Sequence, residues 1–235
     1  MKGIGILLTA ICMGLSPGIA NGATALLVGG YGQYATLTDE EMATAFGGYF
    51  ADYTRVNVPF PGTSDMGYSI QQGTTALYDT LYATYAALQQ AGGPIQIVIG
   101  GVSEGAPSVD EVLRKLASDP NPPSRDELRA MIYADPGRQR IIWGSKVGSY
   151  TYQPPPDTQY DVTVVKAEYD GMADWPDKWL NLIAVVNAVM GASQLHVAKA
   201  YTDLNTVPAA DITTTTSTTC GAPVCGTTTT YLIPT

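Results

Sequence analysis

The stretch Ile95-Gln-Ile-Val-Ile-Gly-Gly-Val-Ser-Glu-Gly105 decides the fold, because it joins an apolar strand to a glycine-rich turn that carries a serine. The first five residues have the pattern of a short strand buried in a sheet. Gly101-Val-Ser-Glu-Gly105 follows at once, and apolar residues at helical spacing come next (Val109, Val112, Leu113 and Leu116). A G-x-S-x-G pentapeptide between a strand and a helix predicts a sharp turn that exposes the hydroxyl of Ser103. An ordinary Gly-Ser turn is the alternative interpretation.

Strands and helices alternate on both sides of this turn. Short apolar runs predict strands at 24–28, 55–58, 130–134 and 162–165. Thr38 and Glu41 have the spacing of a capping box at the start of a helix, and a second helix runs from about Ser69 to Gly92-Gly-Pro94. A late helix carries an apolar stripe of Leu182, Ile183, Val186, Val189 and Met190. This alternation predicts an α/β fold with a mostly parallel central sheet and helices on both faces.

Composition limits the classes of partner. The 235 residues are 45% hydrophobic and 14% charged, which is enough apolar chain for one sizeable core. The formal net charge is -9, and no cluster of lysine and arginine compensates for it. Because such a surface repels a phosphate backbone, nucleic acid is not an expected partner.

The two ends of the chain differ from its centre. After Lys2, the apolar run from Ile4 to Leu15 is too short to span a bilayer comfortably, so residues 1–22 are interpreted as a signal peptide or a membrane tether. The folded α/β domain is expected over 23–211. The remaining 212–235 form a Thr-rich tail, which is interpreted as a linker, an edge ribbon or a glycosylated stalk.

The cysteines fit an exported protein. Cys12 lies in the leader, and Cys220 and Cys225 form a close pair that is predicted to be a disulfide in an oxidising compartment. Metal binding by this pair is the rival interpretation, but two thiolates and one distant histidine do not make a zinc site. No metal and no cofactor are expected.

A serine nucleophile needs a base, and His196 is the one histidine of the chain. It follows the late helix, where the order Ser, acid, His of α/β-hydrolases places the base. The acid is expected on the loop after the strand at 162–165. Asp174, which is followed by Trp175-Pro176, is the preferred acid, and Asp170 is the alternative.

Acyl transfer also requires two donors aimed at the oxyanion. The backbone amide of Glu104 is the first candidate. The loop Gly29-Gly-Tyr-Gly32 offers the second, in the amide of Tyr31. A phosphate-binding glycine loop is the alternative, but this one has neither the Walker lysine nor the full G-x-G-x-x-G spacing.

Several segments together carry a resemblance to a known family. They are Ala25–Gly32, Gly101–Ala106, Tyr133–Gly137 and, most specific of all, Tyr169-Asp-Gly-Met-Ala-Asp-Trp-Pro176 with Asn181, Asn187 and His196 behind it. Over roughly residues 24 to 205 the chain resembles the PE-PPE domain of mycobacteria, a serine α/β-hydrolase domain similar to cutinases. The resemblance implies a triad of Ser103, an aspartate of the last block and His196. It also implies action on acyl esters or acyl transfer between cell-envelope glycolipids.

The chain departs from the family pattern at two places. A signal-like segment stands where a PE or PPE helical leader is expected, which favours a stand-alone exported enzyme, secreted or attached to the membrane or cell envelope. Glu104 occupies a position where glutamine is expected, which leaves the backbone donor intact but is expected to alter local pKa values.

The expected function is therefore that of a serine esterase or acyltransferase. Fifteen tyrosines stand against three phenylalanines, and Tyr150-Thr-Tyr152 lies where these folds often carry a lid. Such amphipathic rings suit an ester with an apolar chain and a polar head, although ordinary surface packing explains them equally well. The alternative is a catalytically silent hydrolase fold that serves as a binding or surface protein.

Overall fold

A seven-stranded sheet forms the centre of the molecule in the computed structural model, which describes residues 22–176, 180–196, 208, 210–218 and 225–234. Neighbouring strands are parallel except for the last pair, which is antiparallel. In spatial order, the strands are β2 (Thr54–Val58), β1 (Thr24–Val28), β3 (Ile97–Val102), β4 (Leu128–Tyr133), β7 (Val162–Ala167), β9 (Thr228–Ile233) and β8 (Thr213–Ser217). The predicted α/β fold with a mostly parallel sheet is confirmed.

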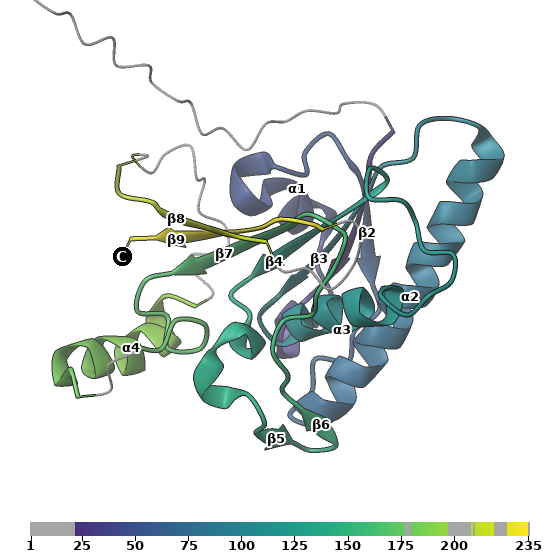
Figure 1. Ribbon diagram of the computed structural model, residues 1–235. Coiled ribbons are helices and arrows are strands. Elements are labelled where there is room, and N and C mark those ends of the chain that lie inside the picture. The colour runs from purple at the N-terminus through teal and green to yellow at the C-terminus, as the bar shows by residue number, and fades with distance from the viewer. Residues whose placement is uncertain (1–21, 177–179, 197–207, 209, 219–224, 235) are drawn as a thin grey trace, which may run out of the picture.

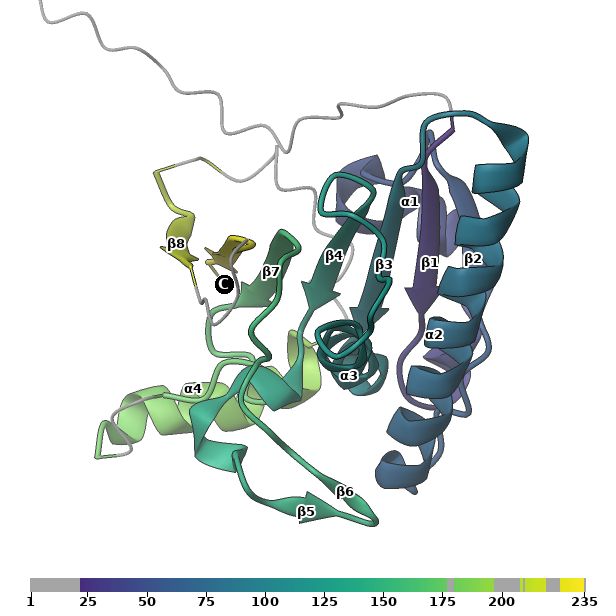
Figure 2. The ribbon, with the colours of Figure 1, turned by 45° about the vertical axis from the view of Figure 1, so that its right-hand side comes forward.

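Helices cover both faces of the sheet because its central strands are apolar on both sides. In β1, Leu26 and Val28 point to one face, and Ala25 and Leu27 point to the other. The first face is covered by α2 (Met66–Ala91) and α3 (Ala106–Leu116), and the second by α1 (Asp39–Gly48), as Figures 1 and 2 show.

Local signals fix the ends of these helices. Thr38 and Glu41 form the predicted capping box at the start of α1. Asp65 caps α2 by accepting a hydrogen bond from the backbone N–H of Tyr68 at 3.0 Å, and α2 ends at Gly92, whose φ of +71° favours glycine. In the part of the chain that the structure describes, no helix is both long and apolar enough to cross a membrane.

The late helix α4 (Leu182–Gln194) forms as predicted, but its apolar stripe does not face the core. All five large residues of the stripe are more than half exposed, whereas Ala188 is fully buried. Figure 1 shows α4 beyond the carboxyl end of β7, apart from α2 and α3. The helix instead packs through small residues, which allow its backbone to approach the chain that follows β7.

The Thr-rich tail continues the sheet. Strand β9 pairs in parallel with β7, and β8 pairs with β9 at the edge. Ile233 in β9 is fully buried in the core. Of the three interpretations of the tail, the structure therefore shows the edge ribbon, and the expected boundary at residue 212 does not separate the tail from the rest of the sheet. Threonine is β-branched and packs well on a pleated surface, so a run that cannot build a core of its own extends an existing one.

The predicted disulfide and leader are not placed by the structure. Cys220 and residues 1–21 lie outside the described residues. The pairing of Cys220 with Cys225 therefore stays a prediction.

Candidate active site

Ser103 sits on a sharp turn between β3 and α3. The turn is the short helix η2 (Ser103–Gly105), and Ser103 has a φ of +54°, which is strained for a residue with a side chain. The flanking glycines allow the turn to pack. A Cβ atom on Gly105 would lie 2.0 Å from the carbonyl oxygen of Gly29, and one on Gly101 would lie 2.9 Å from the Cα atom of Ala106. The strand, turn and helix predicted around Ser103 are all present.

His196 lies beside the nucleophile. Its Nε2 atom is 2.7 Å from the Oγ atom of Ser103, and the imidazole side chain is only 10% exposed. The residue follows α4 directly, so the position of this helix sets the position of the ring.

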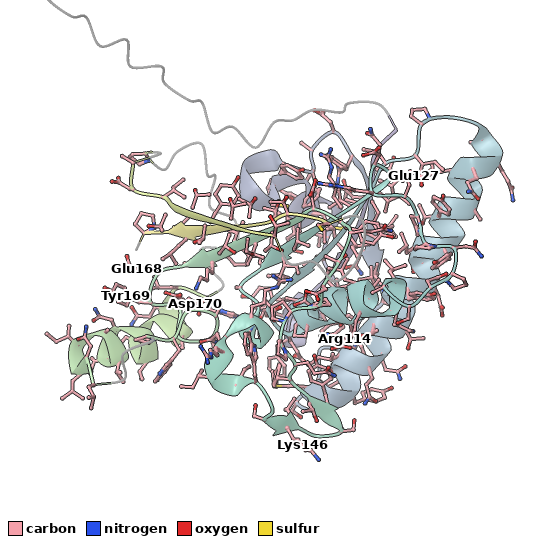
Figure 3. The ribbon with its side chains drawn as sticks, in the orientation of Figure 1. Arg114, Glu127, Lys146, Glu168, Tyr169 and Asp170 are labelled. Carbon is pink, nitrogen blue, oxygen red and sulfur yellow. The ribbon has the colours of Figure 1, made fainter. Side chains whose placement is uncertain are left out.

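Asp170 holds the other side of the imidazole. Its Oδ2 atom is 2.7 Å from Nδ1 of His196, and its Oδ1 atom accepts a hydrogen bond from the backbone N–H of Met172 at 3.0 Å. The carboxylate is fully buried. Figure 3 shows Asp170 beside Tyr169 on the loop between β7 and α4.

Asp174 does not contact the imidazole, contrary to the expectation from sequence. Its Oδ1 atom lies 2.5 Å from Nζ of Lys166, and its Oδ2 atom accepts a hydrogen bond from the backbone N–H of Tyr169 at 3.3 Å. The loop turns between the two aspartates, where the Asp174 amide bonds to the Asp170 carbonyl. This turn directs Asp174 back to Lys166 in the preceding strand β7. The alternative acid, Asp170, therefore occupies the position beside the imidazole of His196.

Backbone contact between the acid loop and α4 aligns Asp170 with His196. A Cβ atom on Gly171 would lie 2.2 Å from the carbonyl oxygen of Ala188. One on Gly191 would lie 1.9 Å from the carbonyl oxygen of Tyr169. These two glycines therefore let the helix lie directly on the loop. The spacing of these glycines in the sequence does not indicate that the acid loop and α4 lie against each other.

A pocket of about 720 Å³ opens over the Ser103 and His196 side chains. Its walls come from the loop after β1, the start of α2, the turn η2, the acid loop and α4. Most of the lining side chains are apolar or aromatic, and the set is Gly30, Tyr31, Gly32, Gln33, Tyr34, Leu37, Ser64, Met66, Val102, Ser103, Glu104, Met172, Ala192 and His196. An apolar cavity that ends at a nucleophile suits the acyl chain of an ester.

The residues expected to supply the oxyanion donors are both at this pocket. Glu104 follows Ser103 in the turn η2, just before α3, and Tyr31 lies in the loop after β1. That loop passes close to the nucleophile, since a Cβ atom on Gly30 would lie 3.5 Å from Cβ of Ser103. The structure thus brings Ser103, His196, Asp170, Tyr31 and Glu104 to one end of the sheet.

The side chain of Glu104, which was expected to alter local pKa values, is only 2% exposed. Neither carboxyl oxygen has hydrogen-bonding geometry with another described group. Burial raises the pKa of this carboxyl, and the nearby Ser69 hydroxyl opposes the shift. The one signal in the sequence was an acidic residue inside an otherwise uncharged turn.

The tyrosines expected at a lid do not line the pocket. They belong to a small hairpin of β5 (Lys146–Val147) and β6 (Tyr150–Thr151). The Tyr150 hydroxyl donates a hydrogen bond to Glu111 of α3 at 2.9 Å, and Tyr152 is buried. Structural packing is therefore the interpretation that fits this segment. The aromatic residues of the pocket are Tyr31 and Tyr34, which come from the loop after β1.

A buried ionic cluster lies outside the pocket lining. Arg138 pairs with Asp110 of α3 and lies 3.7 Å from the carboxylate of Asp135, at the end of β4. Burial, with the neighbouring charge of Asp110, raises the pKa of Asp135. Among the described residues, no group of three or more His, Cys, Asp or Glu side chains has the arrangement of a metal site.

Comparison with known proteins identifies a family. The family model of the PE-PPE domain matches residues 51–235. The diacyltrehalose acyltransferase Chp2 of Mycobacterium tuberculosis is 32% identical over 183 residues, which cover 72% of this chain and 47% of the relative. The SL1278 acyltransferase Chp1 of the same organism is 33% identical, with 94% of this chain and 57% of the relative covered.

Two further matches are more distant. The esterase PE16 of M. tuberculosis is 30% identical over 59% of this chain and 27% of its own length. A Trichoderma reesei cutinase in complex with a phosphonate inhibitor aligns with a TM-score of 0.40 and 18% identity, over 77% of this chain and 76% of the cutinase. The chain spans about half the length of the curated relatives that it matches first.

Proposed function

Because the chain belongs to the PE-PPE domain family, we propose that it is a serine esterase or acyltransferase that forms an acyl-enzyme on Ser103. The observation that carries this proposal is the pair of 2.7 Å contacts that link Asp170, His196 and Ser103 at the edge of an apolar pocket. A catalytically silent fold has no need to maintain a strained serine in contact with a buried imidazole and carboxylate.

The first half-reaction uses each of these groups. Nε2 of His196 accepts the hydroxyl proton while Oγ of Ser103 attacks the ester carbonyl carbon, which gives a tetrahedral oxyanion. The backbone amides of Glu104 and Tyr31 donate hydrogen bonds to that oxyanion. Asp170 fixes the tautomer and orientation of the imidazole. As the intermediate collapses, the protonated His196 gives its proton to the departing alcohol, and the acyl group remains on Ser103.

Hydrolysis and acyl transfer differ only in the second half-reaction, in the nucleophile that attacks the acyl-enzyme. His196 deprotonates either water or a second alcohol, which attacks the acyl-enzyme and releases an acid or a new ester. Two relatives are named as acyltransferases and one as an esterase, so both outcomes occur among similar chains. We assign the substrate to amphiphilic acyl esters, including glycolipids of the cell envelope, since the pocket is apolar around the nucleophile.

The place of action follows from the leader. Residues 1–22 have the pattern of a signal peptide or tether, and we assign the enzyme to the outside of the cytoplasmic membrane on that ground. Fractionation of cells that produce the full chain tests this assignment. Recovery of the protein in the cytoplasm alone would contradict it.

A fluorophosphonate probe tests the activity directly. We expect the probe to label the wild-type chain and a Ser118→Ala variant, which removes an exposed hydroxyl at the end of α3. Ser103→Ala should remove the label. Equal labelling of wild type and Ser103→Ala, or no labelling of a folded wild-type chain, would favour the silent binding protein.

Hydrolysis and transfer are then separated by product analysis. The enzyme is given an acyl ester with and without a sugar as a competing acceptor. Formation of an acylated sugar at the expense of free acid identifies a transferase, and unchanged release of acid identifies an esterase.

A further inference from the structure

The exposed apolar stripe of α4 is, after the catalytic pocket, a second surface with the properties of a binding site. Its residues, Leu182, Ile183, Val186, Val189 and Met190, are 55% to 77% exposed. At 100° per residue they fall within about 120° of the helical circumference, so they form one continuous aliphatic face. The opposite side carries Ala188 and Gly191, which pack on the acid loop. One side of α4 is therefore anchored, and on the other Leu182, Ile183, Val186 and Val189 are each more than half exposed.

The open face has no charge. The helix sequence LIAVVNAVMGASQ contains no acidic or basic residue. Such a face cannot be explained as a solvated surface, since an exposed helix of a soluble domain ordinarily presents charged and polar groups to water. A contiguous apolar patch of this kind marks a contact with another molecule or with a lipid phase.

The face is continuous with the mouth of the catalytic pocket. Ala192 of α4 and His196, which follows the helix, line the pocket. Met172 lines it as well and is 40% exposed. The aliphatic surface therefore runs from the helix to the rim of the site. Whatever lies against α4 lies next to the entrance used by the acyl chain.

We infer that this face of α4, with Met172, docks the enzyme on the surface of a lipid aggregate, so that the acyl chain of a substrate passes from the aggregate into the pocket. The inference rests on the proposed function and adds to it that the substrate is taken from an assembled lipid phase. Aliphatic side chains without hydrogen-bonding groups match acyl chains, whereas protein interfaces concentrate aromatic residues, arginine and methionine. The helix α4 has one methionine and no aromatic residue or arginine. The formal charge of -9 directs the choice toward an electrically neutral lipid surface.

A tryptophan reporter tests the contact on the full chain. Val186→Trp places the indole on the aliphatic face, and Gln72→Trp places one on the exposed side of α2, at the opposite edge of the sheet (Figure 1). Both changes are made with Ser103→Ala, so that no turnover is needed. Because the chain already contains three tryptophans, each variant is compared with the Ser103→Ala parent. On addition of phosphatidylcholine vesicles, we expect a blue shift beyond that of the parent for Val186→Trp and none beyond it for Gln72→Trp. The shift should persist at high salt, because the contact is apolar.

The same reporter distinguishes a lipid surface from the other molecules or segments that could cover the apolar face of α4. Emission of Val186→Trp that is already blue-shifted at all protein dilutions without lipid would show that a segment of the chain itself, such as the apolar leader, covers α4. A blue shift that appears with rising protein concentration and no lipid would show a second copy. Either result, or an identical response of the two reporters to vesicles, would overturn the inference.

Kinetics test the link to the pocket. The rate on one ester is measured below and above the concentration at which it aggregates. For Ile183→Ser with Val186→Ser we expect kcat/KM on the aggregated ester to fall about tenfold with the monomer rate unchanged, because two aliphatic anchors are lost at the interface. The matched control is Ile183→Val with Val186→Ile, which keeps the face apolar and should retain both rates.

The two proposals fail in different ways. Equal loss on monomeric and aggregated ester would place the serine variants in the catalytic step and overturn docking, with the esterase intact. Absence of probe labelling at Ser103 together with a vesicle-dependent shift at position 186 would overturn the proposed enzyme and leave the lipid contact standing.

Discussion

The helices α3 and α4 are similar in length, 11 and 13 residues, and each adjoins a residue of the candidate triad, Ser103 before α3 and His196 after α4, but they are held in opposite ways. Charged residues occur in α3, yet eight of its residues are buried, and its Asp110 pairs with Arg138. No charged residue occurs in α4, yet its large side chains face outward. The nucleophile is thus carried by a helix embedded in the core, whereas the base follows a helix attached by a few small residues.

Because of this difference, the stability of the fold and the alignment of His196 with Ser103 depend on different parts of the molecule. Changes on the α3 side act on the core and are expected to alter the free energy of unfolding. Changes between the acid loop and α4 are expected to move His196 relative to Ser103 with less effect on the whole fold, because little apolar surface is buried there.

The largest expected effect is on the α4 side, at the acid. Asp170→Asn should lower kcat by about 10³- to 10⁴-fold, because the amide cannot hold the imidazole in the required tautomer or stabilise its protonated form. Asp174→Asn should lower kcat only slightly, since Asp174 pairs with Lys166. Steady-state kinetics of the two variants, with thermal unfolding as the control for folding, test the pair. The opposite ranking would return the role of acid to Asp174.

The second prediction compares two glycines, one beside each helix. Gly105→Ala forces a methyl group toward the Gly29 carbonyl, just after the end of β1, and should cost about 3 kcal/mol of unfolding free energy. Gly191→Ala meets the Tyr169 carbonyl instead, so the weakly held α4 should shift. We expect a smaller loss of stability and a fall in kcat of about 10²-fold from misplacement of His196.

Urea unfolding and kcat of both glycine variants measure this contrast. Gly92→Ala serves as a control for a change confined to a helix end, since nothing lies within 4 Å of its added methyl group, although its φ of +71° gives it a conformational cost of its own. If Gly191→Ala unfolds as readily as Gly105→Ala, then α4 belongs to the same cooperative core as α3, and the comparison of the two helices is wrong.

The same comparison explains which features the sequence predicts. Around Ser103, every level agrees: the strand is apolar, the turn has its glycines, and the helix after it is amphipathic, so local pattern and final structure coincide. The capping box at Thr38 is equally local. Such features depend on residues a few positions apart, so they can be recognised in a single amino-acid sequence.

The features that could not be predicted depend on contacts between distant segments. The choice between Asp170 and Asp174 depends on which way one loop turns, and both residue types fit the motif. The stripe of α4 has the same periodicity whether the core or another phase covers it, because a hydrophobic pattern marks a face and not its partner. The threonines of β9 lack the apolar run of a central strand, and only the adjoining β7 makes them part of the sheet.

The smallest expected effect is on the α3 side, at Glu104, and it is a dependence on pH. Burial raises the pKa of this carboxyl, so it keeps its proton to higher pH than an exposed glutamate. Above the raised pKa the side chain becomes a buried anion one residue from the nucleophile, where it opposes the negative charge of the tetrahedral intermediate. Activity of the wild type should therefore decline as pH rises through the pKa of Glu104. The sign is the same for stability, because a carboxyl whose pKa is higher in the folded state stabilises the fold most at low pH and loses that contribution as it ionises.

Glu104→Gln isolates this effect, since the amide has nearly the same shape and cannot ionise. The groups that face Glu104 from other elements are the Ser69 hydroxyl of α2 and Tyr152, whose pKa is raised to about 12 by burial and by the charges of Asp135 and Glu104, so neither becomes charged before the carboxyl does. We expect the variant to match the wild type at pH values below the pKa of Glu104 and to exceed it by about tenfold above that pKa, where one unfavourable charge has been removed. The measurement is kcat/KM against pH for both proteins, with unfolding followed over the same range. Superimposable profiles would show that the charge of the Glu104 carboxyl does not affect the oxyanion. The α3 side of the site would then act only by positioning Ser103 and the backbone donor.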